Sequence, residues 1–167
     1  SGGLRQRMMI AMALVCRPKL LIADEPTTAV DVTVQAQILE LLRELKRKYE
    51  LSLLLISHDL SVVGTMADRV AVMYAGRIIE VGPTVEVLSR PQHPYTAGLL
   101  RSLPELKGPR RERLETLSGV VPNLADLPPG CRFEPRCPVR VPECTAEVPP
   151  LQEVSPGHWV SCIRAPF

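Results

Sequence analysis

Two adjacent acidic residues, Asp24 and Glu25, directly follow an uninterrupted apolar run, Leu20-Leu21-Ile22-Ala23. Such a run predicts a strand covered on both faces, as in a parallel sheet, and open α/β sheets bind ligands at the carboxyl ends of their strands. Neighbouring carboxylates with different tasks suit phosphate chemistry: Asp24 would hold Mg²⁺, and Glu25 would direct a water molecule at a phosphorus atom. A strand followed by an ordinary acidic turn has the same pattern, so other segments of the chain are needed to distinguish the two interpretations.

A histidine follows a second predicted strand. Residues 51–56 form another apolar run, and Ser57-His58-Asp59 comes directly after it. Between the strands, residues 32–49 carry apolar side chains at spacings of three and four, which predicts a helix with one buried face, and Asp31 can cap its start. This order predicts a βαβ unit. The acidic pair and His58 then both lie at carboxyl ends of strands, although a single histidine after a strand is more commonly structural.

Glycines precede the first predicted helix, residues 4–15. Ser1, Gly2 and Gly3 would place a hydroxyl and open backbone N–H groups at the positive end of the helix dipole, which is a site for phosphate. A simple serine cap is the alternative. Cys16 ends this helix and is expected to be a small buried residue.

Four segments match known motifs in order and spacing. They are Ser1-Gly2-Gly3-Leu4-Arg5-Gln6-Arg7, Leu20 to Pro26, Ala29-Val30-Asp31 and Ser57-His58-Asp59. In that order they resemble the signature motif without its leading leucine, the Walker B strand with its catalytic glutamate, the D-loop and the switch histidine of ATP-binding cassette (ABC) ATPases. Val30 stands where the family usually has leucine. Because no G-x-x-x-x-G-K-[ST] motif and no glutamine loop occur, the chain is expected to be the carboxyl-terminal part of a longer subunit.

The resemblance implies ATP and Mg²⁺ as ligands and a role for each motif. Asp24 would position Mg²⁺, Glu25 would orient and deprotonate the attacking water, and His58 would contact the γ-phosphate. In this family two subunits enclose two ATP molecules, and the signature motif of one subunit meets the nucleotide of the other. The residues implied around that nucleotide are Ser1, Gly2, Gly3, Gln6 and Asp31.

Proline divides the chain into two parts. All but two of the seventeen prolines lie from Pro83 onward, and proline interrupts helices and central strands. The first part is therefore expected to be regular α/β structure, and the second to contain short helices and extended segments. Residues 69–74 and 77–81 predict a hairpin with glycine at its turn, Thr84 is expected to cap a short helix, and His93 to cap another.

The segment that contains His93 lies outside the general cassette pattern. Arg90-Pro91-Gln92-His93-Pro94-Tyr95-Thr96 and Leu99-Leu100-Arg101-Ser102-Leu103-Pro104 resemble the carboxyl-terminal extension of importers for oligopeptides, dipeptides and nickel. The resemblance implies three kinds of partner: a second ABC ATPase subunit, identical or homologous; two transmembrane permeases; and an extracytoplasmic peptide-binding protein. It also implies a peripheral location at the cytoplasmic face of the cell membrane. The sequence does not distinguish the cargo, because the binding protein and permeases select it.

Cys131, Cys137, Cys144 and Cys162 lie in the final proline-rich stretch. Four thiolates in a region with little regular structure suggest a bound metal that holds the segment together. There is no C-x-x-C pair, which is the commonest zinc signature, and four cysteines can also hold an iron–sulfur cluster. The segments around these cysteines resemble the peptide-importer tail, in which four such residues can bind a [4Fe-4S] cluster; zinc is the alternative. Phe133 and Trp159 are expected to shield this site from water.

Composition narrows the function classes. The chain has 167 residues, of which 46% are apolar, and a net charge of +2 with both signs interspersed, so it has no basic stripe for nucleic acid. No apolar run approaches the roughly 20 residues of a membrane span. Five cysteines beside nucleotide motifs favour a reducing compartment.

The expected fold is α/β: the carboxyl-terminal part of a P-loop NTPase domain of the ABC type with parallel strands, followed by an irregular proline- and cysteine-rich tail. The expected domains are residues 1–82 for the nucleotide-binding part, 83–130 for the importer-specific extension and linker, and 131–167 for the metal-binding tail. The expected function is ATP hydrolysis for peptide import, and this chain alone is expected to be inactive. The alternatives are a soluble ABC ATPase in DNA repair or translation, or a non-catalytic, metal-bound interaction module.

Overall fold

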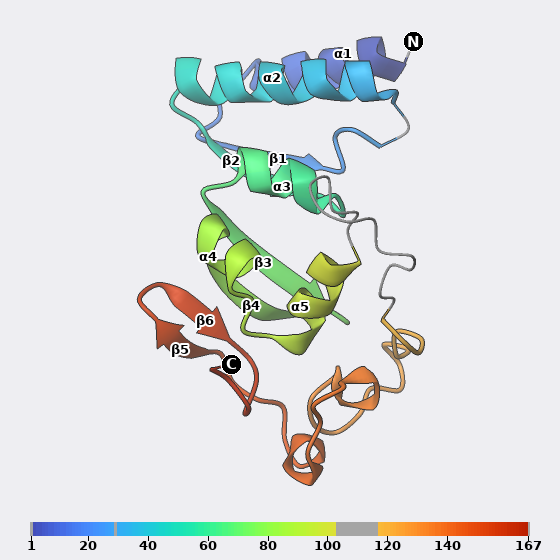
Figure 1. Ribbon diagram of the computed structural model, residues 1–167. Helices are drawn as coiled ribbons and strands as arrows, with labels where there is room; N and C mark the ends of the chain where they lie inside the picture. The colour runs from blue at the N-terminus through green and yellow to red at the C-terminus, as the bar shows by residue number, and fades with distance from the viewer. Residues whose placement is uncertain (1, 29, 103–116, 167) are drawn as a thin grey trace, which may run out of the picture. The chain divides into compact units, whose positions relative to one another are not determined.

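The computed structural model describes residues 2–28, 30–102 and 117–166. The chain divides into two compact units, residues 1–67 and residues 68–167, and each is described by itself (Figure 1). Ser1, Ala29 and residues 103–116 of the predicted extension and linker lie outside the described residues.

The first unit alternates helices and strands. Its elements are α1 (Gly2–Leu14), β1 (Leu20–Asp24), α2 (Val32–Lys48), β2 (Ser52–Ile56) and α3 (Leu60–Met66). The strands pair in parallel, with Leu20 opposite Ser52 and Asp24 opposite Ile56. Both strands therefore end at the same edge of the sheet, as the strand–helix–strand pattern predicted.

One face of this small sheet carries the core of the unit. Leu21 of β1 packs with Ile38 and Leu42 of α2, and Ile10 and Leu14 of α1 pack against the same cluster. Gly3 lies within the first turn of α1 and not before the helix as predicted. A Cβ at this position would meet Val34 of α2 at 2.5 Å. A small residue at this position lets the two helices approach closely.

The opposite face of the sheet is exposed within this chain, although its apolar runs are typical of strands covered on both faces. Leu20 and Ile22 of β1 are 51% and 59% exposed, and Leu54 and Ile56 of β2 are 49% and 45% exposed. The reason is that α1 and α2 pack on one side only, so alternate residues of each strand remain uncovered. Cys16 is exposed as well, contrary to prediction, because α1 ends at Leu14.

The second unit is built on an antiparallel sheet of strand order β3-β4-β6-β5. Its strands are β3 (Arg69–Tyr74), β4 (Arg77–Pro83), β5 (Gln152–Ser155) and β6 (His158–Val160). The β3–β4 hairpin was predicted, and its turn residue Gly76 has a φ of 79°. The tail is less irregular than expected, because β6 extends the hairpin sheet by pairing Val160 with Glu80 and Trp159 with Val81.

Short helices complete the second unit. They are α4 (Thr84–Ser89), α5 (Pro94–Arg101) and the 3₁₀ turns η1 (Glu134–Arg136) and η2 (Pro142–Thr145). His93 caps α5 as predicted, since its Nδ1 accepts a hydrogen bond from the Tyr95 backbone N–H at 3.1 Å. The prediction for Thr84 was wrong: it is the first residue of α4, and its buried Oγ1 has no hydrogen-bond partner among the described residues.

None of the helices in the described part of the chain is both long enough and apolar enough to cross a membrane.

Candidate functional site

The acidic pair and the histidine predicted from the two strands meet at one edge of the first sheet. His58 Nδ1 lies 3.0 Å from Glu25 Oε1, although the two residues are 33 positions apart. The Glu25 backbone N–H donates to the Ile56 carbonyl at 2.9 Å, which extends the ladder one step past β1. The parallel register therefore brings these two side chains together.

Glu25 has an unusual backbone conformation. Its φ is 44°, in the left-handed region that residues with a Cβ rarely occupy. Such conformations cost of the order of 1–3 kcal/mol and cluster at functional sites. Here the left-handed residue turns the chain sharply at the end of β1, and the Thr28 N–H closes the turn on the Glu25 carbonyl at 3.1 Å.

Both carboxylate oxygens of Glu25 accept hydrogen bonds. The Thr28 hydroxyl donates to Oε2 at 2.7 Å, and the His58 ring contacts Oε1. The hydrogen bond from Thr28, followed by that from His58, holds the pKa of Glu25 below its ordinary value. Glu25 is therefore ionised at neutral pH, as a residue that orients water and accepts its proton must be.

Glu25 and His58 line an open pocket, together with Thr27, Thr28, Gln35 of α2, Ser57 and Asp59. Gln35 of α2 donates to Asp59 at 3.5 Å, and Asp59 caps α3 through the Ser61 N–H at 2.9 Å. The hydrogen bond from the Ser61 hydroxyl is the main cause of the lowered pKa of Asp59. These contacts fix the segment that carries His58, while the His58 side chain itself stays 78% exposed.

The other residues predicted around nucleotides lie on separate elements. Gly2, Gly3 and Gln6 lie in α1, and Asp31 caps α2 by accepting from the Val34 N–H at 2.9 Å. Asp24 is exposed at the end of β1. The structure thus brings Glu25 and His58 into contact, whereas no hydrogen bond or ion pair among the described residues joins α1 to them.

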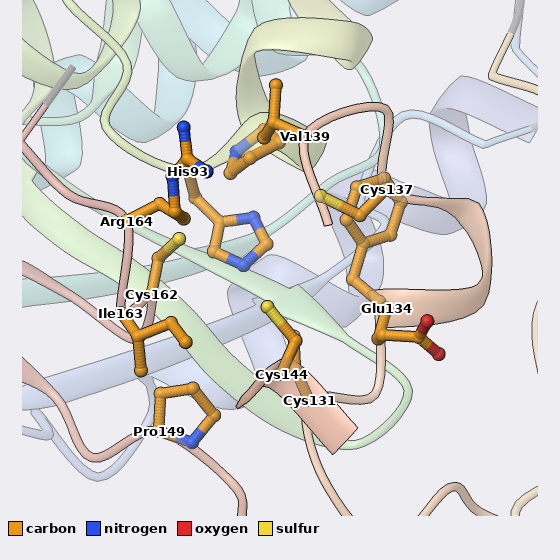
Figure 2. A pocket seen from close by; sticks show the side chains of 12 residues that line it. His93, Cys131, Glu134, Cys137, Val139, Cys144, Pro149, Cys162, Ile163 and Arg164 are labelled. Atoms are coloured by element: carbon orange, nitrogen blue, oxygen red, sulfur yellow. The ribbon is translucent and has the colours of Figure 1, made fainter. Parts of the chain in front are cut away.

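The four cysteines of the second unit line one pocket, together with His93 and Phe133 (Figure 2). All four are free thiols. Trp159 is not part of this lining and is 37% exposed, so the expectation that it shields the cysteines was wrong, whereas Phe133 is 1% exposed and lies against them.

Different short elements position the four cysteines. Cys131 and Cys137 flank η1, Cys144 lies in η2, and Cys162 follows β6. The Cys131 N–H donates to the Cys144 carbonyl at 2.8 Å, and this crossing requires Gly130, since a Cβ there would lie 2.1 Å from the same carbonyl oxygen. A backbone hydrogen bond from Ser161 to Ile79 at 2.8 Å fixes the segment of Cys162 on β4.

A buried carboxylate, Glu80 of β4, joins the hairpin to this pocket. It is fully buried and accepts from the backbone N–H groups of Gln92 and His93, at 2.6 and 3.1 Å. His158 Nε2 of β6 lies 2.8 Å from the same carboxylate. Glu80 thus positions both the tail strand and the loop that carries His93.

Burial shapes the acid–base behaviour of the pocket. It raises the pKa values of Cys131, Cys137 and Cys162, and the neighbouring thiols add to this rise. Burial also lowers the pKa of His93 to about 4, so its ring is neutral at pH 7. The raised pKa values favour the neutral thiol over the thiolate for Cys131, Cys137 and Cys162 at pH 7.

Within residues 2–28, 30–102 and 117–166, no group of three or more His, Cys, Asp or Glu side chains is arranged to hold a metal ion. This applies to the four cysteines and to the surroundings of Asp24. The cysteine pocket is narrow, so a metal group could enter only if the side chains that line it moved apart.

Sequence reasoning missed three residues of these sites. Thr28 was treated as an ordinary turn residue, although it is the main hydrogen-bond donor to Glu25. Glu80 was passed over inside a predicted strand, where a charge between Ile79 and Val81 was the available signal. Arg136 was also missed: it holds the cysteine segment through bonds to Ser118 O at 2.8 Å and Tyr74 Oη at 3.2 Å.

Two family profiles match parts of the chain. The profile described as "ABC transporter" matches residues 1–28, which include the signature segment and β1. The profile described as "Oligopeptide/dipeptide transporter, C-terminal region" matches residues 79–144, which include Glu80, His93 and three of the four cysteines.

Individual relatives match nearly the whole chain. A Brucella ovis protein named for peptide import and ATP binding is 56% identical over 98% of this chain and 50% of its own length. The oligopeptide transport ATP-binding protein of Salmonella typhimurium is 55% identical over 98% of this chain and 48% of its own length. The dipeptide transport ATP-binding protein of Escherichia coli is 53% identical over 97% of this chain and 49% of its own length. The chain thus spans about half the length of the curated relatives it matches.

A solved structure agrees with these matches. The ATP-binding cassette of an ABC transporter in its ADP conformation superimposes with a TM-score of 0.52 at 31% identity, over 59% of this chain and 39% of that one. The chain therefore belongs to the family of ABC transporter ATP-binding proteins, in the branch whose members are named for oligopeptide and dipeptide transport.

Proposed function

We propose that this chain is the carboxyl-terminal part of an ATP-hydrolysing subunit that drives peptide import. The observation that carries the proposal is the contact between Glu25 Oε1 and His58 Nδ1 at 3.0 Å, at the shared carboxyl edge of two parallel strands. The names of its relatives favour import over DNA repair, translation or a non-catalytic metal-bound module.

The chemistry follows from the charges at this edge. Glu25, ionised and oriented by Thr28, accepts a hydrogen bond from the attacking water and takes its proton. His58 is exposed beside it and contacts the terminal phosphate. Asp24 is the residue that would hold Mg²⁺, which neutralises phosphate charge when bound. A single exposed carboxylate suits this ion, since Mg²⁺ usually takes one or two carboxylates along with substrate phosphates and water.

The remaining motif residues serve a dimer. In our proposal Ser1, Gly2, Gly3, Gln6 and Asp31 lie around the nucleotide of a second ATPase subunit. The start of α1 supports this role, because backbone N–H groups at a helix amino terminus favour phosphate. The further partners are two transmembrane permeases and an extracytoplasmic peptide-binding protein. The subunit then acts peripherally at the cytoplasmic face of the membrane.

The proposal is tested by Glu25→Gln in a subunit that joins this chain to an amino-terminal half with a P-loop. Turnover should fall by roughly 10²–10⁴-fold, because glutamine keeps the shape but cannot accept the proton. ATP-bound dimers should accumulate. Glu44→Gln, on the exposed side of α2, is the matched control and should leave phosphate release unchanged. Unchanged turnover of Glu25→Gln would assign the base elsewhere. The 167-residue chain alone should release no phosphate.

We also propose that Cys131, Cys137, Cys144 and Cys162 hold a [4Fe-4S] cluster with a structural role. The donor set fits: four free thiols line one pocket, and cysteine thiolates are the usual ligands of such clusters. Zinc needs its ligands to converge on one point, whereas a cluster needs them around a larger space. No described group of side chains converges on a single ion, and it is the resemblance of the tail to peptide-importer tails that favours the cluster over zinc.

Anaerobic purification tests the cluster assignment. The chain should contain iron and acid-labile sulfide in equal amounts, with visible absorption that Cys137→Ser weakens. Cys16→Ser is the control, because Cys16 is exposed and outside the pocket. Stoichiometric zinc without iron would reject the cluster and would indicate that the cysteines hold zinc as a structural metal. In the complete subunit, Cys137→Ser should loosen the tail more than it changes ATP hydrolysis.

A further inference from the structure

The position of His58 depends on the backbone that carries it. Its side chain is 78% exposed, and among the described residues its ring has one hydrogen-bond partner, Glu25, at 3.0 Å. A side chain that must act at a defined place needs neighbouring residues to hold it there. The residues on either side of His58 are therefore the ones to examine.

Two neighbours in the chain fix the backbone of His58 locally. The Asp59 N–H donates to Ser57 Oγ at 3.0 Å, and this hydrogen bond spans His58. Asp59 Oδ1 in turn accepts from the Ser61 backbone N–H at 2.9 Å and from the Ser61 hydroxyl at 2.6 Å. These bonds join His58 to residues a few positions away, but they do not fix it relative to α2.

Gln35 supplies the contact to that separate element. Its Nε2 donates to the second oxygen of the Asp59 carboxylate, Oδ2, at 3.5 Å, although the two residues are 24 positions apart. The hydrogen bond from the Ser61 hydroxyl is the main cause of the lowered pKa of Asp59, and the one from Gln35 lowers this pKa further. The acceptor is therefore a charged carboxylate at neutral pH, and a charged acceptor strengthens a hydrogen bond.

The backbone of Gln35 is itself fixed at the start of α2. Its N–H donates to the Asp31 carbonyl at 2.8 Å, and the Asp31 carboxylate caps the helix through the Val34 N–H at 2.9 Å. Gln35 is half-buried and lines the same pocket as Glu25 and His58. One residue thus connects the capped end of α2 with the segment that carries His58.

We propose that Gln35 is a positioning residue for His58: by holding Asp59 against α2, it keeps the His58 ring beside Glu25. This inference rests on the function proposed above, in which His58 contacts the terminal phosphate. A group displaced by about 1 Å can lose up to 10²-fold in rate, so the loss of this contact lowers kcat. Because Gln35 acts through His58, its loss matters only while His58 is present.

Gln35→Leu tests this role, because leucine removes the amide donor and keeps a side chain of similar size that favours a helix. The protein is the subunit that joins this chain to an amino-terminal half with a P-loop. The substitution should lower kcat about five- to tenfold and leave KM for ATP within about twofold of the wild-type value. Glu44→Leu, at an exposed position of α2 outside the pocket, is the matched control and should change neither.

The same substitution in a His58→Ala background separates positioning from a purely structural role. Gln35→Leu should change the kcat of His58→Ala by less than about 1.5-fold, since residues that act as a unit are not additive. An unchanged kcat in Gln35→Leu alone, or a comparable further loss in the double variant, would overturn the role of Gln35. If His58→Ala turned over as fast as wild type, the proposed function of His58 would fail, and this inference with it.

A measurement on the wild-type chain covers the case of a variant that does not fold. In NMR spectra of the 167-residue chain, the side-chain amide protons of Gln35 should shift with the same pH midpoint as the carboxyl carbon of Asp59. The amide of Gln37, whose oxygen accepts from Arg7 at 2.7 Å, is the reference and should not follow that midpoint. Amide protons of Gln35 that do not respond to the titration of Asp59 would overturn the proposal.

Discussion

At the scale of single residues, the proposed catalytic glutamate, Glu25, is held more tightly than a motif can indicate. Glu25 combines a left-handed backbone with hydrogen bonds to both carboxylate oxygens. Thr28 is the main cause of its lowered pKa. A lowered carboxyl pKa means that the ionised form is stabilised in the folded state. The resulting stabilisation of the folded state is present above the pKa that Glu25 has in the unfolded chain. It is lost as the pH falls through the pKa of Glu25 in the folded chain.

Thr28→Val should therefore raise the pKa of Glu25 toward its ordinary value, because the largest hydrogen-bond donor is lost. The check is a pH titration of the Glu25 side-chain carbonyl carbon by NMR. Thr27→Val is the control, since Thr27 lines the same pocket but does not contribute to the lowered pKa of Glu25. Equal titration curves for Thr28→Val and wild type would show that His58 alone sets the pKa of Glu25.

At the scale of elements, the tail is attached to the hairpin through one buried carboxylate. Glu80 contacts β6 through His158 and the start of α5 through two backbone N–H groups. Gly82 allows this approach, because a Cβ there would come within 3.1 Å of His158 and Val87. Removing one partner of a buried polar cluster leaves the others without hydrogen bonds.

Glu80→Ala should lower the free energy of unfolding of the second unit by about 3–5 kcal/mol. Glu86→Ala is the matched control: Glu86 pairs with Arg90 at 2.6 Å on the surface, so its loss should cost less than about 1 kcal/mol. Urea unfolding followed by the fluorescence of Trp159, the single tryptophan of the chain and a residue of β6, measures both. Similar losses in the two variants would contradict the role of Glu80.

At the scale of the whole molecule, the sheet of the first unit leaves apolar side chains exposed. Both units enclose apolar side chains almost completely, such as Ile38 in the first and Phe133 in the second, but one face of β1 and β2 is uncovered. Contiguous exposed apolar surface promotes association, and exposed strands add the risk of pairing between chains.

The 167-residue chain should accordingly bind an apolar fluorescent dye and self-associate. Ile22→Thr combined with Leu54→Thr should reduce both signals, because these side chains lie on the uncovered face. Met73→Thr, at an exposed position of β3, is the control for a change outside this face. Dye fluorescence and light scattering provide the measurement. A monomeric wild-type chain without dye binding would refute this prediction.

Local patterns in the sequence determined the elements of the first unit and the residues of its site. Helical spacing and the Asp31 cap predicted α2, and the two apolar runs predicted β1 and β2. The predicted boundaries lie within a residue or two of the observed ones. The reason is that periodicity and capping depend on residues only a few positions apart. The family motifs assigned Glu25 and His58 in the same way.

Only the tertiary structure decided which distant residues meet. Glu80 and His158 are 78 positions apart, and a glutamate within a strand normally indicates an exposed position. Nothing local predicts that β6 adds to the β3–β4 hairpin, or that His93 turns toward four cysteines that come much later in the chain. These contacts depend on complementary shape and hydrogen bonding between separate elements, because a buried polar group is stable only where the fold supplies its partners.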